Sequence, residues 1–437
     1  MSGSPRARWR WIWAGWLAAA ALILLIAWPR AEWRLLSARL INSQAVEKLG
    51  FGGYLVFDLV DTGGRIWRRS QLDDIDPKPY RDFLREHAAQ VRNPVGPPPT
   101  KQKHVIYLQL ESVDGLMLGG IKDGRATMPF LQNLAEENVY FTNAMDNTAS
   151  GRTTDGEFLV LTSQAPLPRP PVFVSQPLDK IPSLPRVLNE QGYHTASIHG
   201  FNGAFWHREI AHTALGYDEM LFKDDLDLTD HIGWGWSDKA VLRAAAEKVI
   251  ASEKPLFLHV ITLTNHHPYY YIAKEQGIEP GTIEEEFLRS VGYLDEAIEI
   301  FFDKLAEAGM LDDCLIVIYG DHDSAIDEQL EAHLDHTNPR LVTDTVPVVM
   351  VGFNRPATRV DVMAGLQDVP VMVLEELGLE APLTFLGSGW NRWGRSYSAQ
   401  NGGWQSVDGA LLPWTMPVDP AVLTQLAINY PEKLLEP

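Results

Sequence analysis

Short apolar segments alternate with helical patterns between about residues 100 and 351, and this alternation constrains the fold more than any other feature. Runs of four to eight Val, Ile, Leu and aromatic residues between polar stretches are typical of buried strands. The expected strands are 105–110, 194–198, 256–263, 315–319 and 346–351. Helical patterns lie between them, the clearest at 287–308, where the apolar residues share one face and Gly309 follows. Strands that alternate with helices predict an α/β fold, a mostly parallel sheet flanked by helices.

A second feature is the uncharged run WIWAGWLAAAALILLIAW at residues 11–28. Its 18 residues approach the roughly 20 that a membrane-spanning helix needs. Trp11, Trp13 and Trp28 lie where aromatic residues meet the membrane interfaces, and three arginines precede the run. No small-residue cleavage pattern follows it, which favours an uncleaved anchor over a removable signal. We expect a single span with the N-terminus inside the cytoplasm and the residues after the span outside it.

The Pro-rich stretch NPVGPPPT at residues 93–100 predicts a boundary, because consecutive prolines favour an extended spacer. The segment before it is mixed and holds an apolar, strand-like piece at 54–60. The expected organisation is a cytoplasmic N-terminus (1–10), a transmembrane anchor (11–28), a juxtamembrane segment with the Pro-rich linker (29–100), a globular domain (101–390) and a Trp-rich C-terminal extension packed on it (391–437). Trp390, Trp393, Trp404 and Trp414 could stack on sugars or pack against the sheet edge.

Composition excludes several classes of protein. The 437 residues carry 37 Lys and Arg against 57 Asp and Glu, a formal charge of −20, so a broad basic face for nucleic acid is not expected. The one cysteine, Cys314, can form neither an internal disulfide nor a cysteine zinc site. The hydrophobic fraction of 45% is enough for a sizeable core.

Polar residues follow four of the expected strands at the point where each strand ends. They are Glu111, His199, the group Asn265, His266 and His267, and the group Asp321, His322 and Asp323. In open α/β sheets, ligands bind outside the carboxyl ends of the strands. Any one of these residues alone is explained as a cap or a solvated side chain, but four strand ends together predict a site. Glu111, Asp321 and His322 offer two oxygens and a nitrogen, a set suited to Mn²⁺, Mg²⁺ or Zn²⁺.

A nucleophile is expected in TASGRTTDGEF, residues 148–158. These small polar residues lead into an apolar stretch and are typical of a loop that enters a helix. A threonine in the first turn lies beside free backbone N–H groups, which bind anions. A metal beside its oxygen would lower the hydroxyl pKa. Spacing alone allows either Thr153 or Thr154, and a plain capping role is the alternative.

The segment HGFNGAFWHR at residues 199–208 places Trp206 and Arg208 shortly after a strand end. Arginine offers a planar fork for phosphate oxygens, and tryptophan offers a flat wall for a small polar headgroup. A core tryptophan and a surface arginine are the ordinary alternative.

Taken together, these motifs resemble the lipoteichoic acid synthase and phosphoglycerol transferase branch of the alkaline phosphatase/sulfatase superfamily. The resemblance covers about residues 100–390. The motifs that carry it, in the family's order, are IYLQLES (106–112), MPFLQNLAEENVYFTN (128–143), GRTTDGEF (151–158), HGFNGAFWHR (199–208), ITLTNHHPY (261–269), YLDEAIEIFFDKL (293–305) and VIYGDHD (317–323).

The resemblance implies roles for particular residues. Thr153 matches the family's catalytic threonine, and it would contact the metal that Glu111, Asp321 and His322 hold. The positions that match those holding glycerol phosphate are His199, Trp206, Arg208 and His266. By the same resemblance the metal is one Mn²⁺ or Mg²⁺, with Zn²⁺ less favoured. His266 could act as the acid or base, since its reference pKa of about 6.5 permits that role.

The resemblance also implies donor, acceptor and place. The donor is phosphatidylglycerol, the intermediate is a phosphoglycerol-threonine, and the acceptor is a hydroxyl of an envelope glycan or a glycerol-phosphate polymer. The expected location is the bacterial cytoplasmic (inner) membrane, with the catalytic domain on the periplasmic or extracellular side.

Three departures from the family pattern stand out. The chain has one apolar span, whereas familiar members of the family have several. The family's motif GKTSD is replaced by GRTTD at residues 151–155. Asp323 follows the Asp-His pair, where the family usually has an aromatic residue. The alternatives are a phosphodiesterase or phosphatase, a phosphoethanolamine transferase, and a non-catalytic headgroup-binding protein. A sulfatase would need a Cys or Ser in a C/S-x-P-x-R setting, and Cys314 has no such context.

Overall fold

The structure is a computed structural model that describes residue 16 and residues 42–99, 101–336, 344–392, 394–398, 402–407 and 410–436. It divides the chain into two compact units, Met1–Asp76 and Pro77–Pro437. Within the described residues, no helix is both long enough and apolar enough to cross a membrane. The span predicted at 11–28 lies, apart from Trp16, outside the described residues.

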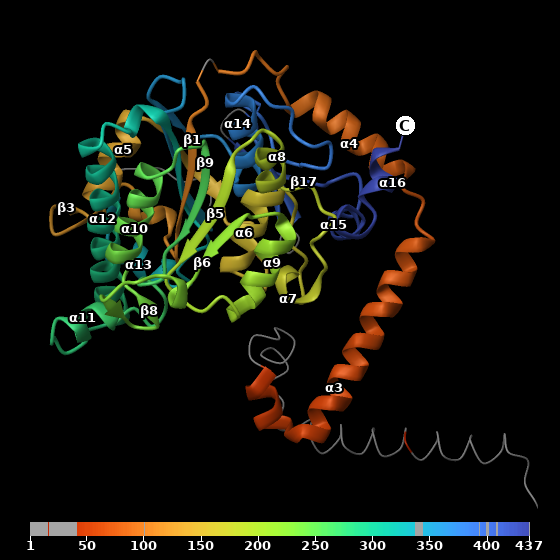
Figure 1. Cartoon of the computed structure of the whole chain (residues 1–437), viewed down its shortest axis with the longest axis horizontal. Coiled ribbons are helices and arrows are strands. Elements are labelled where there is room, and N and C mark those ends of the chain that lie inside the picture. The colour runs from red at the N-terminus through yellow and green to blue at the C-terminus, as the bar shows by residue number, and fades with distance from the viewer. Residues whose placement is uncertain are drawn as a thin grey trace, which may run out of the picture. The chain divides into compact units, whose positions relative to one another are not determined.

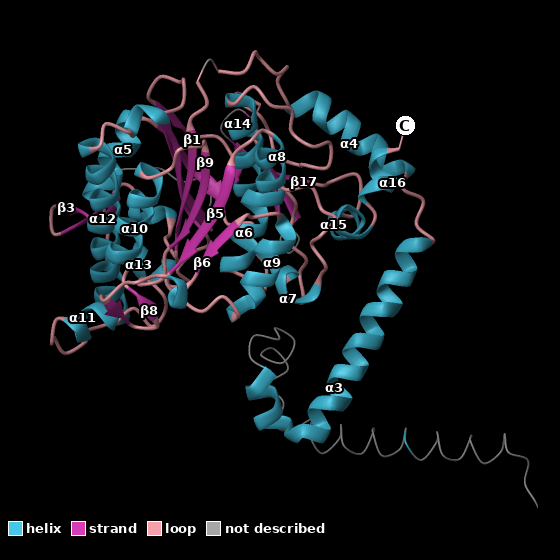
Figure 2. Cartoon of the chain, in the orientation of Figure 1, coloured by secondary structure: helices cyan, strands magenta, loops and turns pink. Residues whose placement is uncertain are grey.

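A nine-stranded sheet forms the centre of the second unit (Figures 1 and 2). Its order is β13-β4-β12-β10-β1-β9-β5-β6, and β14 also pairs with β4. The strands are β1 (His104–Leu110), β4 (Val139–Met145), β5 (His194–His199), β6 (Glu219–Leu221), β9 (Leu256–Ile261), β10 (Cys314–Gly320), β12 (Thr345–Val351), β13 (Thr358–Val360) and β14 (Ala364–Gly365). All neighbours pair in parallel except β12, which is antiparallel to both β10 and β4. This confirms the expected α/β fold, with a sheet that is mixed and mostly parallel.

Helices cover both faces of the sheet (Figure 1). One face packs against α5 (Pro129–Glu137), α10 (Asp238–Ile250), α12 (Ile283–Glu307) and α13 (Asp327–Glu331). The other packs against α6 (Thr153–Thr162), α7 (Val172–Ser175), α8 (Leu184–Glu190), α9 (Arg208–Leu215) and α14 (Val369–Glu376). Central strands such as β1 are buried along their whole length because they lose solvent on both faces.

The second unit begins before the predicted boundary at residue 100. Helix α4 (Lys78–Val91) buries Leu84, His87 and Val91. At its end, Arg92 donates hydrogen bonds to the carbonyl oxygens of Ala381, Pro382, Leu383 and Phe385. Residues 77–92 therefore belong to the compact unit rather than to a linker, because their buried contacts are made with residues far along the chain.

Leu84 gives a direct test of this docking. It is fully buried, so Leu84→Ala is expected to destabilise the second unit by about 2–5 kcal/mol. The matched control is Lys78→Ala on the same helix, which removes an exposed pair with Asp82 and should leave the melting temperature nearly unchanged. Equal melting temperatures for the two variants would show that α4 does not pack on the domain.

The first unit contains helix α3 (Asn42–Asp73), which is interrupted by non-helical backbone at Gly50. The apolar piece 54–60, expected as strand-like, is therefore helical. A short apolar piece of this kind fits both a helix and a strand, so the sequence pattern alone does not distinguish the two.

The C-terminal residues form a three-stranded antiparallel sheet of β15 (Arg395–Ser398), β16 (Gly402–Val407) and β17 (Ala410–Trp414), followed by α15 (Pro420–Asn429) and α16 (Pro431–Leu435). Thr424 of α15 donates to the Ala165 carbonyl oxygen, and Ile428 joins the core under the sheet. Trp390 is buried and donates to the Met372 carbonyl oxygen, which is a packing role. Trp414 is partly exposed, while Trp393 and the Trp404 side chain lie outside the described residues.

Candidate active site

Glu111 and Asp321 are brought together by the register of two neighbouring strands. Strands β1 and β10 pair in parallel with Leu110 opposite Gly320, so the residue that follows each strand lies beside the other. The Asp321 N–H donates to the Leu110 carbonyl oxygen at 3.1 Å, which extends this register past the strand ends. The carboxyl-end site expected from the sequence is therefore formed at the centre of the sheet.

His322 completes a group of three convergent side chains. One potential ligand atom from each of Glu111, Asp321 and His322 lies within 4.8 Å of the others, and all three residues are buried. His322 Nε2 is 3.5 Å from Glu111 Oε1 and 3.7 Å from Asp321 Oδ1. In the described part of the chain, no other His, Cys, Asp or Glu trio converges in this way.

The first turn of α6 places Thr153 against this group. Thr153 Oγ1 is 3.3 Å from Glu111 Oε2 and 3.4 Å from His322 Nε2. Thr154 Oγ1 instead donates to the Gly151 carbonyl oxygen at 3.2 Å. The structure therefore separates the two threonines that spacing alone left open, and Thr153 is the one that faces the carboxylates.

Glycine is required where α6 approaches the strand end. A Cβ added at Gly156 would lie 2.8 Å from the Asp321 carbonyl oxygen. At Gly151 it would lie 2.3 Å from Asp155 Oδ1, whose carboxylate accepts from the N–H groups of Ala149 and Gly151. The glycines of GRTTDGEF thus allow α6 to come close to the backbone of Asp321.

The charges of Glu111, Asp321 and His322 shift one another's pKa values. Burial raises the pKa of Asp321 to about 7, although the His322 charge opposes this. Burial would raise the pKa of Glu111 too, but hydrogen bonding to His322 and the charges of His266 and His322 outweigh it and hold the value at about 2. Burial would lower the pKa of His322, but the Asp321 charge and the Glu111 hydrogen bond raise it to about 9.

These values fit a cation site. Two buried carboxylates need positive charge between them, which the protonated imidazole supplies when no metal is bound. A divalent cation would supply that charge instead and leave Nε2 as a nitrogen ligand. Two carboxylates, one imidazole and a hydroxyl suit Mn²⁺, Mg²⁺ or Zn²⁺.

Arg152 and Asp323 hold the imidazole of His322 from its other side. His322 Nδ1 is 2.7 Å from the Asp323 carbonyl oxygen, so a proton on Nδ1 leaves Nε2 free to bind a metal. Arg152 Nη2 donates to that same carbonyl oxygen at 2.7 Å and to the Asp323 carboxylate. Arg152 also pairs with Asp146 at 3.6 Å. Two of the departures noted in the sequence, Arg in GRTTD and Asp after the Asp-His pair, therefore contact each other.

Gln109 was missed by sequence reasoning, although it is a polar residue within an otherwise apolar strand. Its Nε2 donates to Asp321 Oδ2 at 3.3 Å and to the Thr153 carbonyl oxygen at 3.4 Å. Its Oε1 accepts from Tyr319 at 2.7 Å and lies 3.1 Å from His259 Nε2. One fully buried amide thus connects a carboxylate of the site to the start of α6.

Replacing Gln109 with Leu tests this connection. The variant keeps the side-chain volume but removes the donor to Asp321 Oδ2 and the oxygen that Tyr319 and His259 share, while those two side chains remain 2.9 Å from each other. We expect roughly 10–100-fold weaker metal binding and a stability loss of about 1–3 kcal/mol, measured by titration calorimetry and thermal unfolding. Unchanged metal affinity would show that Gln109 does not orient Asp321.

Three further polar residues, of which the sequence indicated only Asn265, fix the Glu111 backbone and carboxylate. Thr262 Oγ1 accepts from the Glu111 N–H at 2.9 Å, and Asn265 Nδ2 donates to the Glu111 carbonyl oxygen at 2.9 Å. Ser112 donates its hydroxyl to Glu111 Oε1 and its N–H to Asp321 Oδ1, both at 2.8 Å. Of these residues only Asn265 was indicated by the sequence, because it belongs to the polar group that follows the expected strand 256–263.

Arg208, predicted to bind phosphate, is buried at the start of α9. Its Nε and Nη2 donate to the Glu157 carboxylate at 2.8–3.1 Å, and Glu157 lies one helical turn after Thr153 on α6. Burial would raise the pKa of Glu157, but the Arg208 charge and His212 keep it well below its usual range. Nη1 of Arg208 is buried and has no hydrogen-bond partner among the described residues. The guanidinium is thus fixed in place with one nitrogen left to bind an anion.

His199 lies at the end of β5 and is buried. Its Nδ1 is 3.0 Å from the Ile261 carbonyl oxygen. Burial, together with the Arg208 charge, lowers the pKa of His199 to about 3. The imidazole is therefore neutral at physiological pH, with Nδ1–H donating to the carbonyl and Nε2 left to accept.

Trp206 and His266 lie in the loops after β5 and β9. Trp206 is buried with a left-handed backbone, φ 58°. His266 is partly exposed, its Nδ1 lies 2.8 Å from the His267 carbonyl oxygen, and its ring centre is 4.2 Å from that of Trp234. Within the described part of the chain, neither residue forms a hydrogen bond with the Glu111–Asp321–His322 group. Trp234, whose ring is tilted by 37° from that of His266, was not found from the sequence.

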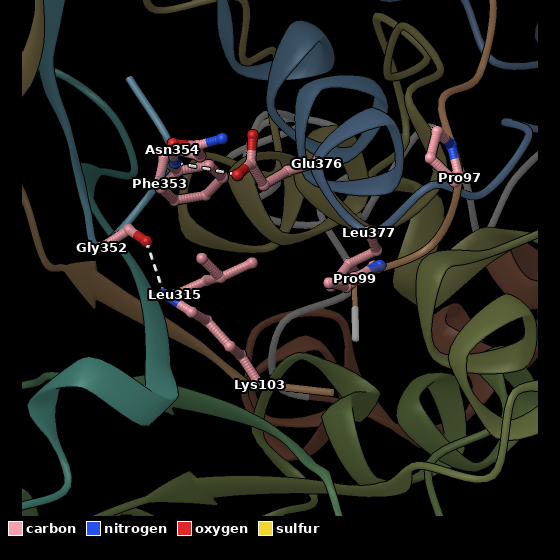
Figure 3. Close-up of a pocket in the computed structure, with 9 residues that line it drawn as sticks. All are labelled: Pro97, Pro99, Lys103, Leu315, Gly352, Phe353, Asn354, Glu376 and Leu377. Carbon is pink, nitrogen blue, oxygen red and sulfur yellow. Dashed lines mark hydrogen bonds between the residues drawn. The ribbon is translucent and has the colours of Figure 1, made fainter. Parts of the chain in front are cut away.

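A cavity of about 530 Å³ lies elsewhere, as Figure 3 shows. It is lined by Pro97, Pro99, Lys103, Leu315, Gly352, Phe353, Asn354, Glu376 and Leu377. Lys103 precedes β1 and Leu315 is at the start of β10, so this cavity lies at the amino ends of these parallel strands. The candidate active site lies at their carboxyl ends and is a separate place.

Comparison with protein families matches residues 103–370 to the family described as Sulfatase. Among curated proteins, the chain is 31% identical to lipoteichoic acid synthase 1 of Bacillus subtilis (strain 168), over 66% of this chain and 47% of that protein. It is 27% identical to lipoteichoic acid synthase 2 of the same strain, over 83% of this chain and 59% of that protein. It is 28% identical to the lipoteichoic acid synthase of Staphylococcus aureus (strain USA300), over 66% of this chain and 46% of that protein. The chain thus spans about half the length of these relatives.

Two solved structures share the fold. The lipoteichoic acid synthase LtaP from Listeria monocytogenes superposes with a TM-score of 0.65 and 20% identity, over 82% of this chain and 97% of that one. A protein in the alkaline phosphatase superfamily from Vibrio parahaemolyticus superposes with a TM-score of 0.64 and 21% identity, over 83% of this chain and 98% of that one. At these identities the likeness concerns the fold alone.

Proposed function

The chain belongs to the sulfatase family, and from that membership and the geometry of the site we propose that it is a metal-dependent phosphoglycerol transferase. It takes glycerol phosphate from phosphatidylglycerol and passes it to a hydroxyl of an envelope glycan or glycerol-phosphate polymer. The observation that carries the proposal is Thr153 Oγ1, 3.3 Å from Glu111 Oε2 and 3.4 Å from His322 Nε2. Two curated relatives are named lipoteichoic acid synthases, and this supports an envelope polymer as the product.

Glu111, Asp321 and His322, with Thr153, would hold one Mn²⁺ or Mg²⁺. When bound, this cation supplies Lewis-acid charge that lowers the pKa of the Thr153 hydroxyl. The remaining chemistry belongs to the side chains of this chain, which position the phosphate and move protons.

In the first step, Thr153 Oγ1 forms a bond to phosphorus and the bond from phosphorus to the diacylglycerol oxygen breaks. His266 gives a proton to that leaving oxygen, and the threonine proton passes to solvent. In the second step, the acceptor hydroxyl bonds to phosphorus and gives its proton to His266. The bond from phosphorus to Thr153 Oγ1 breaks, and the threonine oxygen takes back a proton from solvent. His266 suits this exchange because it is partly exposed and its Nδ1 is already committed to the His267 carbonyl oxygen.

Arg208 and His199 would bind the headgroup. The free Nη1 of Arg208 donates to a non-bridging phosphate oxygen, where charge grows during transfer. The neutral His199 accepts from a glycerol hydroxyl through Nε2, and Trp206 forms a wall of the same subsite. A cytoplasmic-membrane anchor at 11–28, with the catalytic domain on the periplasmic or extracellular side, would keep this site near its lipid.

The test uses vesicles that contain phosphatidylglycerol with a labelled glycerol headgroup, together with Mn²⁺. We expect diacylglycerol to be released and the label to move to an added glycerol-phosphate polymer or glycan. Label released only as free glycerol phosphate would indicate a phosphodiesterase. Turnover of phosphatidylethanolamine instead would indicate a phosphoethanolamine transferase, and binding without turnover would leave a headgroup-binding protein.

A further inference from the structure

Helix α3 carries a group of large apolar side chains that face solvent. Six of them, between 45% and 71% exposed, lie in the helical stretch after Gly50: Phe51, Leu55, Leu59, Val60, Ile66 and Trp67. A Cβ added at Gly52 or Gly63 in the same stretch would meet nothing within 4 Å, so the surface around these side chains is open. Contiguous apolar surface of this kind is unusual in a water-soluble segment and indicates an interaction site.

These residues occupy one side of the helix. At about 100° per residue, the six exposed apolar positions fall within roughly half of the circumference, together with Gly52 and Gly63. From Phe51 to Trp67, this half contains no charged residue. The charged positions Asp58, Asp61 and Arg65 fall in a narrow arc on the other side. Leu72, an apolar residue at a position on that other side, is buried.

From this face we propose that residues 51–67 of α3 lie in the plane of a lipid bilayer, with the exposed apolar half in the interface. An apolar arc that covers half the circumference suits a flat surface, whereas pairing with a second copy needs a narrower stripe at a and d positions. The segment Arg65-Ile-Trp-Arg-Arg69 adds three basic residues around a tryptophan, a combination favoured at anionic headgroups.

The rest of the chain supports a bilayer over another partner. The chain carries a formal charge of −20, whereas residues 65–69 hold three of its basic residues and no acidic one. Twenty-two residues, 29–50, separate the apolar run at 11–28 from Phe51. Only residues 74–77 separate α3 from α4, so α3 in the bilayer would keep the second unit close to the headgroups.

The test uses single-cysteine labelling of the full chain. The lone Cys314 is buried, and a Cys314→Ser background removes it as a reaction site. In that background, Leu59→Cys places a polarity-sensitive fluorophore on the apolar half, and Asp61→Cys places it on the charged arc as the matched control. Both proteins are reconstituted in vesicles of phosphatidylglycerol and phosphatidylcholine, with or without nitroxide-labelled lipid.

We expect the fluorophore at 59 to emit several-fold more strongly and at shorter wavelength than the one at 61. Nitroxide lipid should quench it, and aqueous iodide should not, whereas the reverse should hold at 61. Equal quenching by iodide at both positions would overturn the proposal. Shielding at 59 without quenching by nitroxide lipid, accompanied by energy transfer between copies, would also overturn it and would identify a second copy as the partner.

Discussion

Replacing Thr153 with alanine is expected to reduce turnover of phosphatidylglycerol by at least about 1,000-fold, because the variant loses the atom that bonds to phosphorus. Metal should still bind, since Glu111, Asp321 and His322 converge without help from the hydroxyl. The measurement is diacylglycerol release from vesicles, with Mn²⁺ affinity determined by calorimetry on the same preparation. Thr153→Ser, which keeps a hydroxyl, should retain part of the activity.

Thr154→Ala is the matched control. It removes the neighbouring hydroxyl on the same turn, which donates to the Gly151 carbonyl oxygen and does not face the carboxylates. We expect its turnover to stay within about tenfold of the unmodified protein, the loss reflecting one local hydrogen bond. Full activity in Thr153→Ala, with loss in Thr154→Ala, would transfer the nucleophile to the other threonine.

Replacing Asp321 with asparagine is expected to have the second large effect. The side chain keeps its shape but loses the negative charge, so the buried group retains one carboxylate for a divalent cation. We expect the affinity for Mn²⁺ to fall by about 100-fold or more, since outer partners of metal ligands alone are worth 10–100-fold. Turnover at fixed Mn²⁺ should fall in parallel, and excess Mn²⁺ should restore part of it.

Asp323→Asn is the control for this charge. Asp323 is two residues further on, and its carboxylate pairs with Arg152. Its carbonyl oxygen, which holds His322 Nδ1, is unchanged by the substitution. We therefore expect Asp323→Asn to change metal affinity far less than Asp321→Asn. Equal losses in the two variants would indicate general electrostatics rather than a ligand role for Asp321.

The strand ends were the part of the site that sequence could predict. Periodicity located β1, β5, β9, β10 and β12 to within two residues, and polar residues after buried strands indicated the carboxyl-end site. Periodicity cannot show whether a strand runs parallel or antiparallel to its neighbours, because the pattern of apolar residues is the same in both cases. The antiparallel course of β12 and the pairing of Leu110 with Gly320 therefore came only from the structure.

Three further features depend on contacts between distant parts of the chain. The choice of Thr153 over Thr154 depends on the rotation of α6 against the sheet, which Gly156 allows. Gln109 was a polar residue in an apolar run, but its partners lie on two other elements. Helix α4 appeared to belong to a linker because its buried partners, such as residues 381–386, lie nearly 300 positions later.

Intact mass after brief incubation with phosphatidylglycerol and Mn²⁺, without any acceptor, tests the central claim most directly. The account predicts a protein species heavier by one phosphoglycerol unit, mapped to Thr153, absent in Thr153→Ala and present in Thr154→Ala. Diacylglycerol release with no adduct at any quench time, or an adduct on another residue, would contradict the proposed covalent course.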